Sequence, residues 1–320
     1  MKYIGIDIGG TKCAVSLGED DCRELKIIDK SKFPTAGKKP ETVLDEFMLN
    51  LDLLLAKYDL KYSDFDGIGI SCGGPLNSET GIIMSPPNLP GWDDVHAVEY
   101  FTEKTKLPCN LQNDANACAV AEWKYGAGKG TKNMIFMTFG TGLGAGLILN
   151  GKLYSGTSDM AGEVGHLRLS DYGPVGYGKI GSFEGFCSGG GIAQIGVLLA
   201  KEQESRGNVC ELLKRAGSYD AINAKIIGDM ADEGDELCIQ AYRISGEMLG
   251  KGLSIVIDIL NPERIVIGGV FAKSSHLLLP YAQKVIDEET LIYSGRVCEV
   301  VPCGLGDKVG DYAALSVASL

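Results

Sequence analysis

The stretch FGTGLGAG, residues 139–146, follows the apolar run 133–138 and carries glycines at alternating positions, as a nucleotide-binding turn does. A dinucleotide-binding fingerprint requires a strand, a glycine turn and then a helix, because the pyrophosphate is held at the helix N-terminus. Here residues 146–154 are rich in strand-forming side chains and are interrupted by Asn150-Gly151, the strongest short hairpin signal. The glycines are therefore predicted to join one strand to the next.

The composition bounds the class of protein. A chain of 320 residues is long for one core and sufficient for two domains. Its apolar content of 45% and charged content of 22% are ordinary for a soluble globular protein. The apolar runs are much shorter than the roughly 18 residues of a membrane span. Asp7 would interrupt the apolar core of a secretory signal, so we expect a cytoplasmic protein with no membrane partner.

The net charge limits the possible partners, and the cysteine spacing indicates the redox state of the thiols. The formal net charge of −12 disfavours a nucleic-acid partner, because proteins that bind nucleic acid present a basic face to the phosphates. An anionic ligand would then be held locally, by backbone amides and helix N-termini. The ten cysteines are scattered from Cys13 to Cys303 without a Cys-x-x-Cys pair. We expect them to be reduced thiols, most of them buried.

The two halves of the chain share a coarse plan. The first half predicts strands and helices, in chain order a strand over 2–8, strands over 13–17 and 25–32, a helix over 40–58, strands over 65–71 and 110–112, and a helix over 115–125. The second predicts strand, glycine turn and strand over 133–149, helices over 189–204 and 235–259, and a strand over 264–267. Each half has a glycine hairpin after its first strand, DIGGTK at 7–12 and FGTGLGAG at 139–146. Two such hairpins facing one another across a cleft would clamp phosphates.

Asp114 is the candidate for the chemistry. It follows the strand over 110–112 at the start of the helix over 115–125. One interpretation is that its carboxylate caps the helix, and the other is that it acts as a general base; both can hold. The helix dipole is expected to keep the carboxylate ionised and weakly basic. Phosphoryl transfer tolerates a weak base, because its loose transition state mainly requires a positioned hydroxyl and compensated charge.

Asp7 and Lys12 flank the first glycine turn. A carboxylate beside nucleotide phosphates is expected to act through Mg²⁺, and the alternative for Asp7 is a buried acid bonded to the turn. Lys12 either offers its charge to the terminal phosphate or is a solvated strand residue.

Five motifs in this order resemble the ROK family of sugar kinases, within the actin-like ATPase superfamily. They are GIDIGGTK at 5–12, NDANACAVAEWKYGAGKG at 113–130, FGTGLGAGLILNGKLYSG at 139–156, GEVGH at 162–166 and LNPERIVIGG at 260–269. The resemblance implies an α/β fold of two RNase H-like domains flanking an active-site cleft. Residues 1–115, with a C-terminal helix at about 308–320, would form the smaller domain, with the first phosphate turn and part of the sugar site. Residues 116–307 would form the larger domain, with the second phosphate turn, the adenosine site and a sugar-binding loop.

The resemblance implies a function as well. It implies a homodimeric kinase that uses ATP and Mg²⁺ to phosphorylate a hexose, with the 6-hydroxyl of glucose as the leading acceptor and Asp114 as general base. An N-acylhexosamine such as N-acetylmannosamine, or an epimeric hexose, is the alternative substrate, and a sugar-sensing regulator without catalysis is the alternative of another class. Contacts to ATP are implied for Asp7, Gly9, Gly10, Thr11, Lys12, Thr141, Gly142, Gly268 and Gly269. Contacts to the sugar are implied for Gly74, Asn88, Asn113, Asp114, Glu163, His166 and Glu184.

One loop departs from the family pattern. Many members hold a structural zinc through the histidine of GEVGH and three cysteines, whereas the corresponding stretch here is VGYGKIGSFE, residues 175–184. Val175, Tyr177 and Ser182 stand where the cysteines would be, and none can supply a thiolate ligand. We expect no structural zinc, and the one metal expected is the Mg²⁺ that accompanies ATP, near Asp7. Packing and hydrogen bonds, from Tyr177 and Ser182, are expected to hold the loop that presents Glu184.

Overall fold

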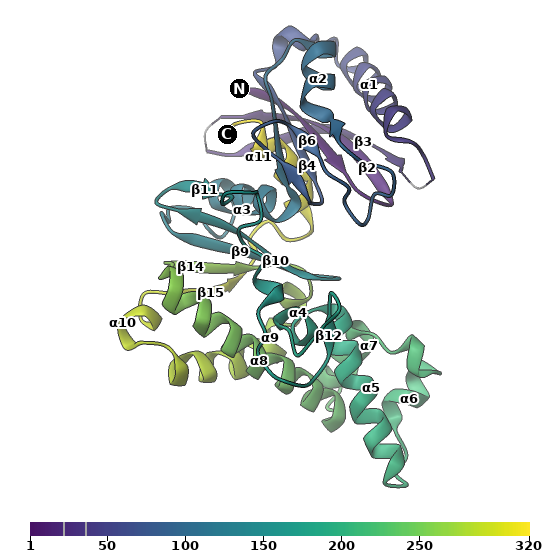
Figure 1. The fold of residues 1–320 in the computed structure, drawn as a ribbon, viewed down its shortest axis with the longest axis vertical. Coiled ribbons are helices and arrows are strands. Elements are labelled where there is room, and N and C mark those ends of the chain that lie inside the picture. The colour runs from purple at the N-terminus through teal and green to yellow at the C-terminus, as the bar shows by residue number, and fades with distance from the viewer. Residues whose placement is uncertain (22, 36) are drawn as a thin grey trace. The chain divides into compact units, whose positions relative to one another are not determined.

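The computed structural model describes residues 1–21, 23–35 and 37–320, which form two compact units of mixed helices and strands (Figure 1). Unit 1 comprises Met1–Lys132, Gly146–Ala161 and Gly304–Leu320, and unit 2 comprises Asn133–Ala145 and Gly162–Cys303. The predicted α/β class is confirmed. Within the described ranges, no helix combines the length and the apolar character that a membrane-spanning helix needs.

The first sheet has five strands in the order β3-β2-β1-β4-β8. They are β1 (Lys2–Ile8), β2 (Lys12–Asp20), β3 (Leu25–Pro34), β4 (Gly67–Cys72) and β8 (Cys109–Asn113). Glycine residues turn the chain between β1 and β2, which are antiparallel, whereas β1, β4 and β8 run parallel. The strands predicted in the first half of the chain are confirmed, with ends shifted by a few residues. Small strands β5 (Leu76–Asn77), β6 (Ile82–Ile83) and β7 (Val95–His96) form a separate sheet.

Helices cover this sheet because its strands alternate in side-chain size. Ile4, Ile6 and Ile8 of β1 are buried in one core with α1 (Pro40–Lys57) and α2 (Ala97–Thr105). The alternate positions are small, and a Cβ added at Gly69 of β4 would lie 2.0 Å from the carbonyl oxygen of Ala314. Glycine there lets α11 (Val309–Val317) pack directly on β1 and β4, and α11 also packs on α3 (Asp114–Tyr125).

The second sheet repeats the strand order of the first. Its order is β11-β10-β9-β14-β15, built from β9 (Met134–Phe139), β10 (Leu143–Leu149), β11 (Lys152–Tyr154), β14 (Arg264–Ile267) and β15 (Glu299–Pro302). In both sheets the first strand in sequence lies third in the order and is followed by an antiparallel hairpin and two parallel strands, so the predicted duplication is confirmed. Asn150 (φ 53°) and Gly151 (φ 72°) make the two-residue turn between β10 and β11, as the sequence predicts.

Unit 2 is rich in helices. The predicted helices over 189–204 and 235–259 are confirmed as α5 (Gly189–Ser205) and α8 (Glu236–Leu260). Helix α9 (Val270–Glu289), which packs on α8, is not among the predicted helices. The remaining helices are α4 (Phe183–Phe186), α6 (Glu211–Ala216), α7 (Ala224–Asp232) and α10 (Ile292–Gly295), and a two-stranded hairpin is formed by β12 (Val175–Gly176) and β13 (Lys179–Ile180).

The division into units differs from the predicted boundaries. A boundary at residue 115 would cut α3 in its first turn, whereas the structure keeps α3 whole, packed on α11, and so places residues 116–132 in unit 1. None of the nine cysteines that the structure describes is in a disulfide, and Cys13, Cys72, Cys187, Cys210 and Cys238 are buried. The expectation for Cys22 lies outside the described residues.

Candidate active site

Unit 1 gathers acidic residues at one edge of its sheet. Strands β1, β4 and β8 are parallel, so their carboxyl ends meet at the same edge. In the register of these strands Asp7 pairs with Ser71, and Cys72 pairs with Asn113. Asp7 and the Asn113-Asp114 pair are therefore brought to one edge, two strands apart.

The helix cap differs from the prediction. Asn113, not Asp114, is the N-cap of α3, and its side-chain oxygen accepts a hydrogen bond of 2.7 Å from the backbone N–H of Asn116. Asp114 is the first residue inside the helix, where Oδ1 accepts from the backbone N–H of Ala115 at 2.8 Å. The interpretation of Asp114 as the cap is wrong, because Asn113 has the extended backbone of an N-cap and the helix begins one residue earlier than predicted.

The electrostatics of Asp114 also differ from the prediction. The helix dipole was expected to keep this carboxylate weakly basic, but burial raises its pKa, and the hydrogen bonds from the backbone lower it by less. The side chain still has an exposed surface, although the surrounding protein atoms remove part of its hydration. Desolvation thus outweighs the helix terminus, and the carboxylate is a better base than expected while open to a ligand.

Asp7 lies in the same electrostatic environment. Burial, together with the negative charges of Asp114 and Asp311, raises the pKa of Asp7 to about 6, and Lys32 and Lys12 oppose this shift. Lys12 is an exposed residue at the start of β2, close enough to act on Asp7. Asp311, in the first turn of α11, is part of this group although the sequence gives no signal for it.

The raised pKa of Asp7 predicts a pH-dependent gain in stability when its charge is removed. The folded pKa of about 6 lies above the ordinary value of 3.8, so ionisation of Asp7 destabilises the folded state as the pH rises through this interval. Asp7→Asn is expected to raise the free energy of unfolding by about 2 kcal/mol at neutral pH, and the gain should disappear as the pH falls below about 4. Urea unfolding at neutral pH and below about pH 4 measures this gain in the free energy of unfolding, with the exposed-site variant Glu79→Gln as control. An equal gain at both pH values would contradict this origin.

Asn88 lies between two glycine segments of unit 1. A Cβ added at Gly10 would be 2.2 Å from the Asn88 carbonyl oxygen, and one added at Gly73 would be 3.1 Å from its Oδ1. Gly10 and Asn88 also line one cavity of about 560 Å³, together with Leu89 and Trp92 among others. The structure therefore brings the predicted sugar residue Asn88 to the predicted phosphate turn. Gly74 follows Gly73, and the space beside its Cα is open.

The second glycine turn is bonded to Glu184. Thr141 is exposed at the tip of the turn between β9 and β10, where the N–H of Gly140 donates to the carbonyl of Gly142 at 3.0 Å. Glu184 Oε2 accepts from the N–H of Leu143 at 3.0 Å, and a Cβ at Gly142 would lie 2.7 Å from the same oxygen. Glu184, predicted as a sugar ligand, thus holds the second glycine turn with one carboxylate oxygen.

Two further glycine segments adjoin that turn. The N–H of Gly268 donates to Met137, and a Cβ at Gly269, whose φ is +66°, would lie 2.2 Å from the carbonyl oxygen of Phe139. The N–H of Gly189, the first residue of α5, donates to Gly140 at 2.8 Å. The N-terminus of α5 therefore adjoins the second glycine turn, and the sequence analysis did not predict this contact. The run of three glycines after the cap Ser188 could have indicated it, because helix N-termini bind anions.

Glu163 precedes a 3₁₀ turn, Val164–His166, of which His166 is the last residue, and both side chains are exposed. The N–H of His166 donates to the carbonyl of Glu163 at 3.1 Å, which keeps the two residues on one turn. Lys179 Nζ donates to the carbonyl of His166 at 2.6 Å. The turn is thereby joined to the β12–β13 hairpin.

Ser182 holds the loop over 175–184, which differs from the family pattern. Ser182 is fully buried, caps α4 by accepting from the N–H of Gly185 at 3.0 Å and donates to the carbonyl of Gly176 at 3.4 Å. Its expected part in holding the loop is confirmed. Tyr177, which was also expected to hold the loop, contributes little packing to it, because 74% of its surface is exposed.

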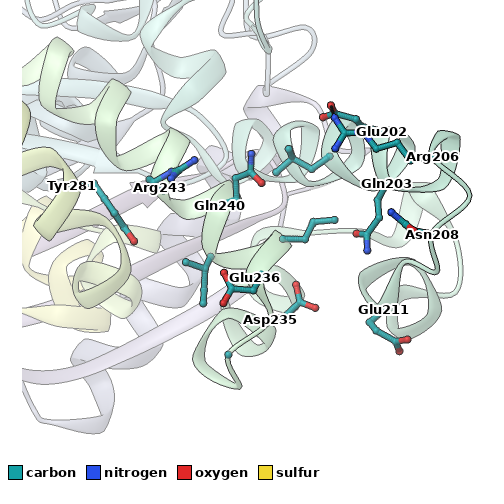
Figure 2. Close-up of a pocket in the computed structure, with 14 residues that line it drawn as sticks. Glu202, Gln203, Arg206, Asn208, Glu211, Asp235, Glu236, Gln240, Arg243 and Tyr281 are labelled. Atoms are coloured by element: carbon teal, nitrogen blue, oxygen red, sulfur yellow. Dashed lines mark hydrogen bonds and ion pairs between the residues drawn. The ribbon is translucent and has the colours of Figure 1, made fainter.

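A separate cavity of about 800 Å³ opens beside α5 and α8 in unit 2 (Figure 2). Figure 2 shows its lining of charged and amide side chains, which includes none of the predicted site residues. Arg206 forms an ion pair of 2.5 Å with Glu202, so part of this charge is compensated within the lining. We assign it no role.

The repeated strand order and the glycine turns define a protein of the actin-like ATPase fold. The chain belongs to the ROK family, whose model matches residues 3–319, so the resemblance drawn from the motifs is confirmed. It is 34% identical over 284 residues to a glucokinase of Halalkalibacterium halodurans, over 87% of this chain and 82% of that protein. It is 29% identical over 319 residues to a glucokinase of Thermotoga maritima, over 99% and 97%. A solved ROK family glucokinase from Streptomyces griseus, in complex with glucose and AMPPNP, superposes with a TM-score of 0.77 at 27% identity, covering 100% of this chain and 99% of that one.

Proposed function

We propose that this chain is an ATP-dependent hexose kinase that phosphorylates the 6-hydroxyl of glucose, with Asp114 as the general base. The observation that carries the proposal is the Asp114 carboxylate, which is open to a ligand, has a raised pKa and lies at the same sheet edge as Asp7, close enough to act on its charge. The glucokinase relatives, which share most of their length with this chain, support glucose as the leading substrate.

The proposed step is a direct phosphoryl transfer. Asp114 accepts the proton of the sugar hydroxyl while the oxygen of that hydroxyl forms a bond to the γ-phosphorus. The bond from the γ-phosphorus to the β,γ-bridging oxygen breaks, and ADP leaves with that electron pair. Because the transition state is loose, positioning of the hydroxyl and compensation of phosphate charge are the main requirements. A carboxylate with a raised pKa removes the proton more readily than an ordinary aspartate does.

The phosphates are proposed to contact both glycine turns, through Gly9, Gly10, Thr11, Lys12, Thr141 and Gly142, with the adenosine near Gly268 and Gly269. The amides at the N-terminus of α5 extend this set, since Gly189 adjoins Gly140. Mg²⁺, when bound with ATP, would neutralise phosphate charge. Asp7 is a suitable ligand for this Mg²⁺, directly or through water. Neighbouring acidic residues destabilise the ionised form of its carboxylate, and a nearby cation would stabilise that form.

The sugar is proposed to contact Gly74, Asn88, Asn113, Asp114, Glu163, His166 and Glu184. Their polar groups match the requirement that each buried hydroxyl finds a partner. An N-acylhexosamine or an epimeric hexose remains the alternative substrate, because it differs by one substituent. A sugar-sensing regulator without catalysis is less favoured, since such a protein has no need of a carboxylate with a raised pKa at the phosphate turn.

A panel of hexoses and N-acylhexosamines, assayed for ADP release, tests this function. Glucose is expected to give the highest kcat/KM. A higher value for an N-acylhexosamine would change the substrate but keep the class of enzyme. Sugar binding without ADP release from any sugar would favour the regulator.

A homodimer in the cytoplasm, with neither nucleic acid nor a membrane as partner, is proposed as the working form. Exposed apolar side chains on α8, α10 and the adjoining residues of unit 2 support an interface between copies; they are Ile259, Leu291, Ile292, Tyr293 and Val297. The acidic net charge of −12 supports the absence of a nucleic-acid partner.

The loop over 175–184 is proposed to need no structural zinc. Ser182 occupies a position where a thiolate would be required and instead caps α4, and a closed zinc site needs four ligands. Elemental analysis of protein purified without chelator is expected to give zinc far below one ion per chain, and EDTA treatment followed by excess Mg²⁺ should leave activity unchanged. Stoichiometric zinc that is lost together with activity would contradict this.

A further inference from the structure

The β12–β13 hairpin has an unusual residue in its turn. Tyr177 and Gly178 form the two-residue loop, with φ of +44° and +75°. Both positions of such a turn require positive φ, which favours Asn-Gly and disfavours a bulky side chain. The same chain uses Asn150-Gly151 for the other hairpin, with φ of 53° and 72°. Tyr177 therefore occupies a position where asparagine would form the turn more easily.

Core packing does not explain the tyrosine. The Tyr177 side chain is 74% exposed, so its ring contributes little apolar burial to the loop. Its ring instead meets the imidazole of His166 edge-on, with centroids 5.8 Å apart and planes at 60°. This is a favourable aromatic arrangement that restricts the rotation of both rings.

The hairpin is also braced on both sides of this contact. The Gln194 side chain of α5 accepts from the N–H of Val175 at 2.9 Å and donates to the carbonyl of Val175 at 2.9 Å. On the other side Lys179 donates to the His166 carbonyl, and Arg168 donates to the carbonyl of Ile180 at 2.7 Å. The backbones that carry Tyr177 and His166 are thus fixed to each other. Strained residues held in this way are concentrated at functional sites.

We propose that Tyr177 is a positioning residue of the sugar site, whose ring holds the His166 imidazole in one orientation toward a hexose hydroxyl. This inference rests on the proposed contact of His166 with the sugar. At this turn position Tyr177 adopts an unfavourable backbone conformation. Its ring orders the His166 imidazole before the sugar binds. Pre-organisation of this kind strengthens binding by lowering the entropy lost on association.

Tyr177→Asn separates this role from a structural one. Asparagine suits the turn, so the midpoint of thermal unfolding should stay the same or rise. The KM for glucose is expected to rise roughly two- to tenfold, the range that one aromatic pair contributes, with a smaller change in kcat. Tyr177→Phe keeps the ring and should stay within about twofold of the wild type. Tyr172→Asn removes another exposed tyrosine, 79% exposed, from the segment that precedes this loop, and should leave KM unchanged.

A second readout does not depend on turnover. The chain has three histidines, so the His166 ring signal in a ¹H–¹³C NMR spectrum can be assigned from its loss in His166→Gln. That signal should move in Tyr177→Asn and remain in place in Tyr172→Asn, because the ring current of Tyr177 acts on it. Absence of hexose phosphorylation by the wild type would overturn the proposed function alone, and the NMR comparison would still decide the ring contact. An unmoved His166 signal, or an unchanged KM in an active Tyr177→Asn enzyme, would overturn the inference.

Discussion

Replacement of Asp114 by asparagine is expected to lower kcat on glucose by roughly 100- to 10,000-fold, the contribution of a positioned general base. The amide has nearly the same size as the carboxylate but cannot accept the hydroxyl proton. The cap of α3 is unaffected, because Asn113 supplies it. The sugar affinity should therefore change little, since the lost interaction acts mainly in the transition state. Steady-state kinetics, together with calorimetric titration of glucose, measure both quantities.

The control for this variant is Glu99→Gln, which removes an exposed carboxylate from the first turn of α2. It should leave kcat and KM within about twofold of the wild type. Near-native turnover of Asp114→Asn would remove Asp114 from the mechanism. An equal loss in sugar affinity would instead indicate a binding role.

Replacement of Glu122 by glutamine is expected to lower the free energy of unfolding by about 3 kcal/mol. Glu122 is fully buried in α3. Its Oε2 accepts from the N–H groups of Ala127 at 2.7 Å and Gly304 at 3.0 Å, and its Oε1 accepts from Leu305 at 2.9 Å. Glutamine would place an amide donor against at least one of these N–H groups, leaving a buried donor unsatisfied. The effect is large because one carboxylate joins α3 to the segment that leads into α11.

Urea unfolding gives the stability of Glu122→Gln, and hydrogen exchange gives its location. The amides of Ala127, Gly304 and Leu305 should exchange faster in the variant, whereas exposed Glu103→Gln should change neither measurement. Unchanged protection at these three amides would show that the carboxylate does not fasten the segment.

Local patterns were sufficient for most of the fold. The alternation of the strands, the Asn150-Gly151 signal and the repeated glycine hairpin predict the five strands of the first sheet, most strands of the second and the repeated plan, because each depends on residues adjacent in sequence. Strand β15 and the order of the strands in the two sheets were not predicted. Helix α9 escaped prediction because Pro280 lies inside it and Ser274 has a non-helical backbone, so its helical pattern is interrupted. The cap of α3 was misplaced by one residue, since Asn113 and Asp114 are both good caps.

The sequence predicted which residues belong to the candidate site but not the contacts that these residues make. Asp7 lies near the end of β1 and Asp114 follows β8, and the parallel strands bring them to one edge. The influence of Asp311 on Asp7 depends on α11 packing against β1, which nothing local to Asp311 indicates. The bond from Leu143 to Glu184 likewise joins residues far apart in sequence. The raised pKa of Asp114 reflects atoms gathered around it by the fold, so the helix terminus alone predicted the wrong direction.

The identity of the product tests the proposed activity most directly. The purified chain would be incubated with glucose, ATP and Mg²⁺, and the mixture followed by ³¹P NMR with Asp114→Asn in parallel. The wild type is expected to convert the γ-phosphate of ATP into the phosphomonoester of glucose 6-phosphate, with one ADP formed for each product, and the variant should do so at a small fraction of that rate. ATP that stays intact, or inorganic phosphate in place of a sugar phosphate, would contradict a hexose kinase.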